Sequence, residues 1–189
     1  MPPKVRVSKE DILRATLEII RQGGEDAVNA RSIADALECS TQPIFREFSS
    51  IDELISETKK AAYSTYIGFI ENEVASEKYP AYKAFGMAYI RFAKEEKELF
   101  KLLFMCDRTG SADVSSEDFE KSVEMIMSTN GFSREKAERM HLEMWSAVHG
   151  IGVMLATSFL ELDFNIVSGM LSDMYHGLRT VHATQEAKA

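Results

Sequence analysis

The sequence predicts an all-α fold of about nine helices, in which a three-helix N-terminal domain precedes a larger helical domain. Three observations lead to this prediction. Hydrophobic residues recur with the 3.6-residue period of helices through nearly all of the 189 residues, and strand-like alternation is essentially missing. The four prolines and ten glycines are scattered, so no linker stands out. With 45% hydrophobic residues, the chain can bury a sizeable core.

The first helix is predicted to begin after Ser8. Ser8 and Asp11 have the spacing of a capping box, in which each side chain accepts a hydrogen bond from the backbone of the other residue. A broad apolar face then starts at Ile12. The helix is expected to end at Gly23 and Gly24, because the left-handed conformation at a helix C-terminus favours glycine.

Two short helices follow over residues 29–48, with almost no chain between them. Asn29 is expected to cap the first, in which Ile33 and Ala34 face inward, and Ser40 or Thr41 is expected to cap the second. The apolar side of the second helix is predicted to consist of Ile44, Phe45 and Phe48.

The remaining helices are predicted from their periodicity alone. Ser49 or Ser50 can cap a long helix that runs to about residue 76. Further helices are expected near residues 79–94, 97–105, 116–130, 133–160 and 164–182.

The net charge of −8 is unevenly distributed along the chain. Residues 1–50 hold seven Lys and Arg against eight Asp and Glu, whereas residues 51–189 hold 15 against 22. A nucleic-acid contact in the first segment must therefore depend on local placement of a few cations. The candidates are Lys4, Arg6, Lys9, Arg31 and Arg46.

The compartment can also be predicted from the sequence. Cys39 and Cys106 are too few for a disulfide framework, and the N-terminus shows no apolar stretch of signal-peptide length. Nowhere does the chain approach the roughly 20 apolar residues that span a bilayer. We therefore expect a cytoplasmic protein with no membrane partner.

Residues 29–48 have the pattern of a helix-turn-helix. Two helices joined by a turn of about three residues cross steeply, so the front of the second projects and can enter the major groove of DNA. Gln42 can bond adenine bidentately there, and the methyl group of Thr41 can meet a thymine methyl. The alternative is that these residues merely begin a buried helix.

The stretch ILRATLEIIRQGG, followed by ARSIADALECSTQPIFREFSSIDELI, resembles the DNA-binding domain of the TetR family of transcriptional regulators. Ile33 and Ala34 match the Ile-Ala pair of the family, and Cys39 with Ser40 matches its turn. The resemblance covers about residues 6–66 and implies a ligand-binding and dimerisation domain over residues 67–189. It also implies a repressor that a small hydrophobic effector releases from a palindromic operator in double-stranded DNA.

Four residues depart from the family pattern. Glu38 stands where the family usually has Gly, and a non-Gly residue in the left-handed conformation costs on the order of 1 kcal/mol. The other three changes remove hydrogen-bond donors or positive charge from the expected DNA contact. They are Phe45 for Tyr, Glu47 for His and Ile51 for Lys. The residues assigned to DNA contact are Lys4, Arg6, Arg31, Ser40, Thr41, Gln42, Pro43, Phe45 and Arg46.

Apolar residues in the last two helices recur in alternating steps of three and four, as in a seam between packed helices. Two such helices from each of two subunits would form a four-helix interface around a two-fold axis. The homodimer interface is predicted to contain Met140, Ala147, Ile151, Met154, Phe164, Val167, Leu171, Met174, Leu178 and Val181. A seam within one subunit is the alternative.

The ten methionines and eleven phenylalanines suggest an adaptable apolar interior that could accept a small hydrophobic molecule. The predicted pocket residues are Met87, Phe92, Phe100, Phe104, Met105, Met125, Met144, Trp145 and His149. Taken singly, each of them is more commonly an ordinary core residue, and His149 is more commonly a core or interface histidine than a ligand contact. The long helix beginning near Ser50 would couple such a pocket to the reading helix.

Two rival functions remain open at this level. Glu138 with His141 and Asp173 with His176 have the spacing of helical di-metal carboxylate sites, which would make the protein an enzyme. An architectural DNA-binding dimer without an effector is the other. The sequence contains no P-loop, dinucleotide-binding or nucleophile-elbow glycine pattern, so we predict no cofactor and no enzyme activity.

Overall fold

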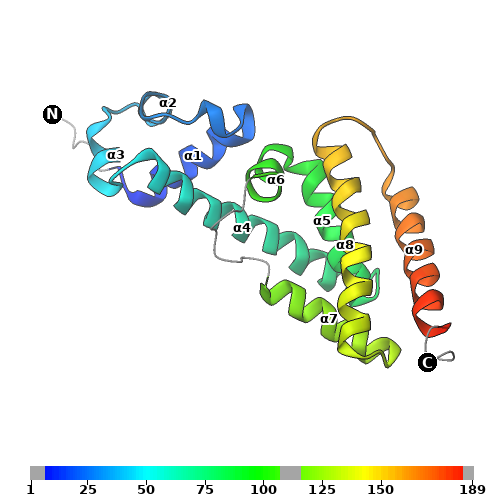
Figure 1. Ribbon diagram of the computed structural model, residues 1–189. Coiled ribbons are helices and arrows are strands. Elements are labelled where there is room, and N and C mark those ends of the chain that lie inside the picture. The colour runs from blue at the N-terminus through cyan, green and yellow to red at the C-terminus, as the bar shows by residue number, and fades with distance from the viewer. Residues whose placement is uncertain (1–6, 107–115, 185–189) are drawn as a thin grey trace. The chain divides into compact units, whose positions relative to one another are not determined.

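The computed structural model describes residues 7–106 and 116–184. The described residues form nine α-helices and one short 3₁₀ helix, and they contain no strand (Figure 1). The all-α prediction is therefore confirmed. The elements are α1 (Lys9–Gly23), η1 (Glu25–Ala27), α2 (Ala30–Ala36), α3 (Gln42–Glu47), α4 (Ile51–Ala75), α5 (Ala81–Glu95), α6 (Lys97–Phe104), α7 (Ser116–Asn130), α8 (Arg134–Ala156) and α9 (Phe164–Thr184).

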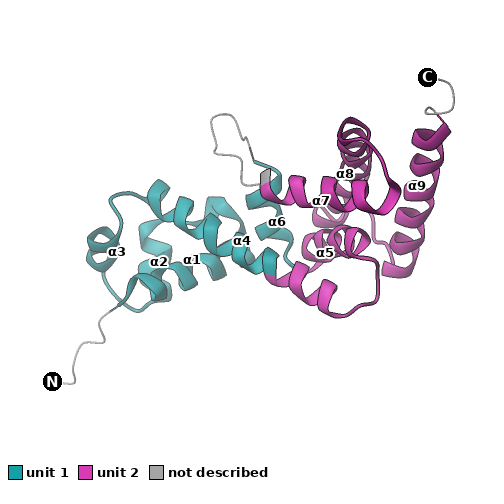
Figure 2. Ribbon diagram, turned by 90° about the horizontal axis from the view of Figure 1, so that it is seen from below, with its two compact units in different colours: residues 1–67, 96–106 teal, residues 68–95, 107–189 magenta. Residues whose placement is uncertain are grey.

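The helices divide into two compact units, which Figure 2 shows in different colours. The first unit consists of residues 1–67 and 96–106, and the second consists of residues 68–95 and 107–189. The long helix α4 contributes residues to both units. Helix α6 belongs to the first unit and packs against α1, although it lies about 75 residues further along the chain. The periodicity of the sequence did not predict this pairing.

Local signals start and end the first helix as expected. The Ser8 hydroxyl accepts a hydrogen bond from the Asp11 backbone N–H at 3.1 Å, and the Asp11 carboxylate accepts one from the Ser8 N–H at 3.1 Å. This confirms the capping box. Gly24 follows the helix with φ 76°, a left-handed value that glycine adopts without strain. Ile12 and Ile20 are fully buried, so α1 forms the centre of the first unit.

Helix α5 forms the centre of the second unit. It packs against α7, α8 and α9, and α8 in turn packs against α7 and α9 (Figure 1). Side chains along α5 are buried on more than one face, which is expected for a central helix. The buried residues of α5 are Ala84, Met87, Ala88, Tyr89, Ile90, Phe92 and Ala93.

Helix α8 ends earlier than the sequence predicts. The apolar pattern continues to residue 160, but α8 ends at Ala156. Ser158 has φ 55°, and the backbone N–H of Phe159 donates to the Met154 carbonyl at 2.9 Å, which turns the chain towards α9. Because Ser158 is not glycine, the sequence gives no conventional C-terminal signal at this turn. None of the described helices is both long enough and apolar enough to cross a membrane.

Candidate DNA-binding interface

Helices α2 and α3 are held at a sharp turn by backbone hydrogen bonds. Asn29 caps α2, because its side-chain oxygen accepts from the backbone N–H groups of Arg31 at 3.1 Å and Ser32 at 2.9 Å. After α2, Glu38 takes φ 49° and the Cys39 N–H donates to the Ala34 carbonyl at 3.0 Å. Glu38 therefore adopts a left-handed φ at the position where the family usually has Gly.

The buried faces of the two short helices lie against α1 and fix their orientation. Ile33 and Ala34 of α2, Ile44 of α3, and Phe48 immediately after it are 0–4% exposed. Both α2 and α3 pack against α1, which buries its Ile12 in the same core. The opposite face of α3 consequently projects outward.

The outward residues at the front of α3 form what we call the reading face: Ser40, Thr41, Gln42, Phe45 and Arg46, all exposed. Gln42 and Arg46 are four residues apart and therefore lie on one side of the helix. Pro43 is half-buried. Phe45 was predicted to face the core as well as to contact DNA, and its 52% exposure shows that the core prediction was wrong.

The predicted cap of α3 is also wrong. Thr41 occupies the N-cap position, but its φ of −73° and ψ of −12° are helical and its side chain makes no cap hydrogen bond. Capping requires an extended backbone at this position and a free N–H two or three residues on, whereas Pro43 supplies no N–H. The Thr41 hydroxyl therefore has no hydrogen-bond partner among the described residues.

The electrostatics of the first unit are unusual for a nucleic-acid interface. Over residues 7–67 there are seven Lys and Arg against eleven Asp and Glu, a balance of −4. Six of the seven cations form an ion pair, and only Arg31 has no ion-pair partner among the described residues. Arg31 is exposed on the first turn of α2. Lys4 and Arg6 lie outside the described residues.

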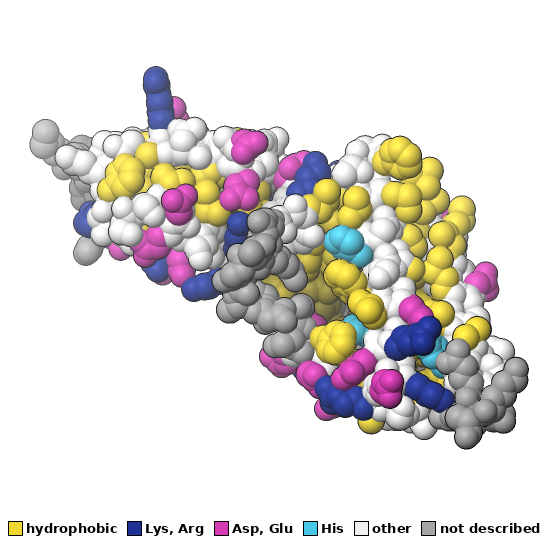
Figure 3. All heavy atoms as spheres, viewed as in Figure 1, with side chains coloured by type: hydrophobic (Ala, Val, Ile, Leu, Met, Phe, Trp, Pro, Cys, Tyr) yellow, Lys and Arg dark blue, Asp and Glu magenta, His cyan; other side chains and the backbone are white. Residues whose placement is uncertain are grey.

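A second candidate surface lies on the last two helices. On the face shown in Figure 3, hydrophobic side chains gather over α8 and α9. Among the exposed large apolar residues, Trp145 is 44% exposed and Phe159 is 80% exposed. The other exposed large apolar residues of α8, α9 and the turn between them are Leu142, Leu160, Ile166, Met174 and Val181, and we call all seven together the α8–α9 apolar surface.

The predicted dimer residues divide between this surface and the subunit interior. Met174 and Val181 belong to the α8–α9 apolar surface, whereas Ala147, Met154, Phe164 and Leu178 are half-buried. Met140, Ile151, Val167 and Leu171 are at most 3% exposed, so they pack inside the subunit and were wrongly assigned to the interface. The alternating steps of three and four residues identified the contacts between helices inside the subunit. The exposed apolar residues lie a few positions away from these in the sequence.

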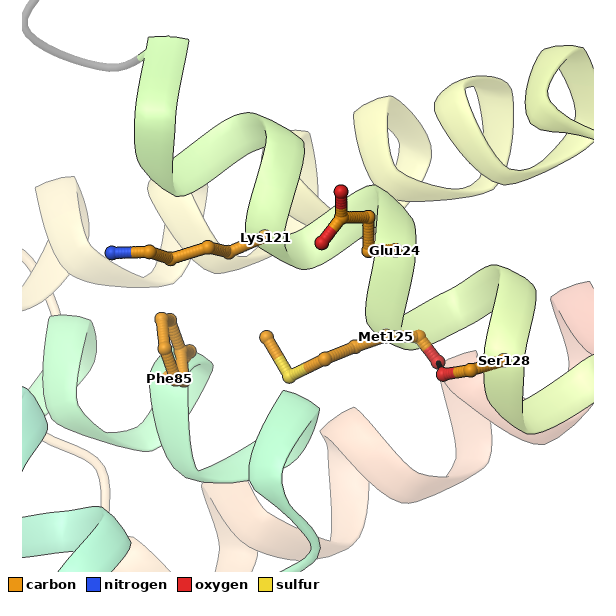
Figure 4. Close-up of a pocket in the computed structure, with 5 residues that line it drawn as sticks. All are labelled: Phe85, Lys121, Glu124, Met125 and Ser128. Carbon is orange, nitrogen blue, oxygen red and sulfur yellow. Dashed lines mark hydrogen bonds between the residues drawn. The ribbon is translucent and has the colours of Figure 1, made fainter.

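The second unit contains a pocket of about 500 Å³ between α5 and α7. Phe85 and Met125 form its apolar floor, and Lys121, Glu124 and Ser128 line its rim. In Figure 4 the Met125 side chain points towards Phe85, while the Glu124 carboxylate points away. The Ser128 hydroxyl donates to the Met125 carbonyl at 3.1 Å. We call this the α5–α7 pocket.

Of the nine predicted pocket residues, Met125 lines the α5–α7 pocket. Met87, Phe92, Phe100 and Met144 are at most 4% exposed, so they have no surface for a ligand and are core residues. Met105 and Trp145 are instead more than 40% exposed on the outside. Phe104 meets Tyr66 edge to face in the first unit, and half-buried His149 lies 2.8 Å from the Tyr89 hydroxyl.

The residues of the rival metal site have other partners. The Glu138 carboxylate accepts from Arg134 at 2.7 Å, and the His141 Nδ1 atom lies 3.0 Å from the Tyr82 hydroxyl. Asp173 and His176 are exposed on α9. Within the described ranges, no group of three or more His, Cys, Asp or Glu side chains is arranged to hold a metal ion.

Comparison with known proteins agrees with this geometry. Residues 12–58, which cover α1 to α3 and the start of α4, match the family of bacterial regulatory proteins called the tetR family. No sequence among curated proteins matches the chain.

Solved structures share the fold over nearly the whole chain. A TetR-like transcriptional regulator from Rhodococcus sp. RHA1 is 14% identical, with a TM-score of 0.68 over 93% of this chain and 96% of that one. A protein of unknown function from the same organism is 18% identical, with a TM-score of 0.75 over 95% and 100%. A third structure, from Pseudomonas aeruginosa PAO1, is 15% identical, with a TM-score of 0.71 over 93% and 92%.

Proposed function

This chain belongs to the TetR family of DNA-binding transcriptional regulators through its N-terminal domain, and we propose that it is a homodimeric repressor that a small hydrophobic effector releases from a palindromic operator. The single observation that carries the DNA-binding half of this proposal is the exposed reading face on α3. Its inner side, at Ile44, is fully buried, so the outer side is held in one orientation.

The chemistry of the reading face supports base recognition. Gln42 can donate to and accept from the edge of adenine, and the methyl and hydroxyl groups of Thr41 are unoccupied by a cap. Exposed Phe45 adds an apolar surface that suits a thymine methyl group. Arg31, which has no ion-pair partner in the described part of the chain, is the natural phosphate contact. We propose that Thr41, Gln42 and Phe45 specify the sequence and that Arg31 positions the domain.

The α8–α9 apolar surface supports a dimer. Exposed apolar patches of this kind on a soluble protein mark interaction sites. A second copy of the chain is the occupant we propose, because a two-fold axis would present two reading helices about 34–36 Å apart, as successive major grooves of a palindrome require. Met174 and Val181 would then be buried between the subunits.

The α5–α7 pocket supports an apolar effector. Its floor consists of Phe85 and of Met125, whose flexible thioether adapts to different shapes and makes favourable contacts with aromatic rings. The pocket of about 500 Å³ is an open hollow, so a bound compound would keep part of its surface in water. Because α5 is joined directly to α6 through Glu96, a ligand that favours one placement of α5 would alter the unit that carries the reading face.

Selection of DNA from a random pool by the purified protein tests the proposed function. We expect the wild-type protein to enrich a palindrome and Gln42→Ala to change the bases that are enriched at particular positions. Arg31→Ala should weaken binding to all sequences by a similar factor. A uniform loss across all sequences for Gln42→Ala would contradict a base-reading role, and no enrichment by the wild-type protein would contradict DNA binding.

The effector is tested on the selected duplex. Small apolar compounds are added to the protein–DNA complex. The release measurement is then repeated for each active compound with the variant Met125→Trp, whose larger side chain fills the pocket. We expect release to be lost in this variant while DNA affinity is retained. Release that persists unchanged would place the effector elsewhere.

A further inference from the structure

The reading face carries a cation that already has partners within the protein. Arg46 lies one helical turn after Gln42 on the same side of α3, which is a suitable position for a phosphate contact. Its Nε atom donates to the Glu47 carboxylate at 2.9 Å, and its Nη2 atom donates to the Val7 carbonyl at 3.2 Å. The guanidinium is therefore turned back onto the protein.

Glu47 is the residue that holds Arg46 in this arrangement. Its side chain is 29% exposed, whereas that of Arg46 is 49% exposed, so the ion pair lies at the surface beside the reading face. The carboxylate neutralises the guanidinium and occupies its Nε–H, one of the donors that a phosphate oxygen could accept from. Pairs this exposed are weak, and a nearby phosphate can compete for the arginine.

We propose that Glu47 attenuates DNA binding by sequestering Arg46, which is a latent phosphate contact. This inference depends on the proposed DNA-reading role of α3. Phosphate contacts add affinity for every DNA sequence. They do not discriminate between sequences, because discrimination comes from contacts with the base edges. By withholding one such contact per subunit, Glu47 lowers the affinity for all DNA equally and leaves recognition to Thr41, Gln42 and Phe45.

The test is a double-mutant cycle on the duplex that the wild-type protein selects and on an unrelated duplex of equal length. The proteins are the wild type, Glu47→Gln, Arg46→Met and the double variant, each measured by fluorescence anisotropy over a range of salt concentrations. We expect Glu47→Gln to tighten binding of both duplexes by about twofold to about thirtyfold for a dimer, the square of the ~1.4- to ~5-fold that one exposed pair contributes.

The salt dependence is the readout that identifies a phosphate contact. Each new contact makes the slope of log affinity against log salt steeper by about 0.9, so two subunits should add about 1.8. Arg46→Met alone should weaken binding of both duplexes modestly, because it leaves the Glu47 carboxylate unneutralised beside the DNA. In the double variant both the gain in affinity and the added slope should disappear.

Glu117→Gln is the matched control, since it also removes the carboxylate from an exposed ion pair, here with Lys121. This pair lies on α7 in the second unit, which does not carry the reading face, so we expect no change in affinity or in salt slope.

Two results would overturn the inference while DNA binding stands. A gain that survives in the double variant would mean that Glu47 acts by simple repulsion of phosphate. If Glu47→Gln changed neither the DNA affinity nor its salt dependence, Glu47 would not be keeping Arg46 from a phosphate. Absence of binding by the wild-type protein to any selected duplex would overturn the proposed function and this inference together.

Discussion

Arg21 and Glu96, 75 residues apart in the chain, form a two-point ion pair in which the Nε and Nη2 atoms of the arginine lie 2.9 and 3.0 Å from the two carboxylate oxygens. The pair joins the end of α1 to the residue that immediately precedes α6. The hydrogen bond from Arg21 to the Glu96 carboxylate raises the pKa of the arginine. The side chains are 33% and 20% exposed, so the bond is partly shielded from water.

Glu96→Gln should therefore destabilise the protein. A charge-assisted ion pair with two hydrogen bonds at this exposure contributes about 1 kcal/mol to the free energy of unfolding. For a chain of this size its loss corresponds to a fall in Tm of about 2–4 °C. Thermal unfolding followed by circular dichroism measures it. Lys121→Gln, which breaks the exposed pair with Glu117, is the control and should shift Tm by much less. Equal shifts for the two variants would show that the Arg21–Glu96 geometry adds nothing.

Glu38→Gly should stabilise the protein. Glu38 has φ 49° after the end of α2, and relief of this strain is expected to contribute on the order of 1 kcal/mol. Denaturant unfolding measures the change in the free energy of unfolding. Asp35→Gly is the opposite control, because a glycine inside α2 should cost about 1 kcal/mol. A loss of stability in both variants would contradict the strain argument.

The thermal stability should fall as the pH decreases below neutrality, partly because of His141. Burial lowers the pKa of His141 from its ordinary 6.5, so the unfolded chain binds this proton more readily than the folded protein. The contribution of the neutral His141 ring to the free energy of unfolding is fully present above pH 6.5. It is lost as the pH falls towards the lower pKa of the folded protein.

Replacement of His141 by asparagine should therefore flatten the dependence of Tm on pH between about 7 and 5.5, a window above the ordinary carboxyl range. Differential scanning calorimetry measures it. His176→Asn, at an exposed position, serves as the control and should keep the wild-type slope. An unchanged slope in His141→Asn would show that another group is responsible.

Trp145→Glu should weaken the proposed dimer. Trp145 is 44% exposed on α8 and stacks on His149 with ring centroids 5.1 Å apart. Loss of a buried interface tryptophan, together with burial of a carboxylate, should raise the dimer Kd by about a hundredfold or more. Analytical ultracentrifugation measures the Kd.

Thr129→Glu adds the same charge at an exposed position of α7 and should leave the dimer intact. Because Trp145 is the single tryptophan, its fluorescence also reports directly on the proposed interface. An emission spectrum that does not change when the wild-type protein is diluted through its dimer Kd would mean that Trp145 lies outside the interface.

Local features were predictable because their partners are close in the chain. The capping box of Ser8 and Asp11 spans three residues, and the Asn29 cap depends on N–H groups within three residues. The family pattern marked position 38 as one where Gly is usual, and Glu38 has a left-handed φ of 49° there. Helix periodicity predicted nine helices, since burial on one face imposes the same spacing wherever it occurs.

The sequence did not predict which apolar residues are buried inside the subunit. A periodic pattern of apolar residues shows that a helix face is buried but not which helix packs against it. Met140 and Val167 follow the same rhythm as an interface seam, but the fold buries them inside the subunit. Leu142 and Ile166 are exposed instead. The prediction that Phe45 faces the core was wrong for a related reason. Ile44 and Phe48 are the buried side chains where α3 packs against α1, and Phe45 lies on the exposed side.

The sequence by itself determined the helices, their caps and the DNA-binding domain, since each depends on interactions within a few residues or on a motif of continuous chain. Tertiary structure alone decided that α6 joins α1 and that Phe85 meets Met125 across the α5–α7 pocket. These features depend on residues brought together from distant parts of the chain, and such contacts leave no period or spacing in the sequence.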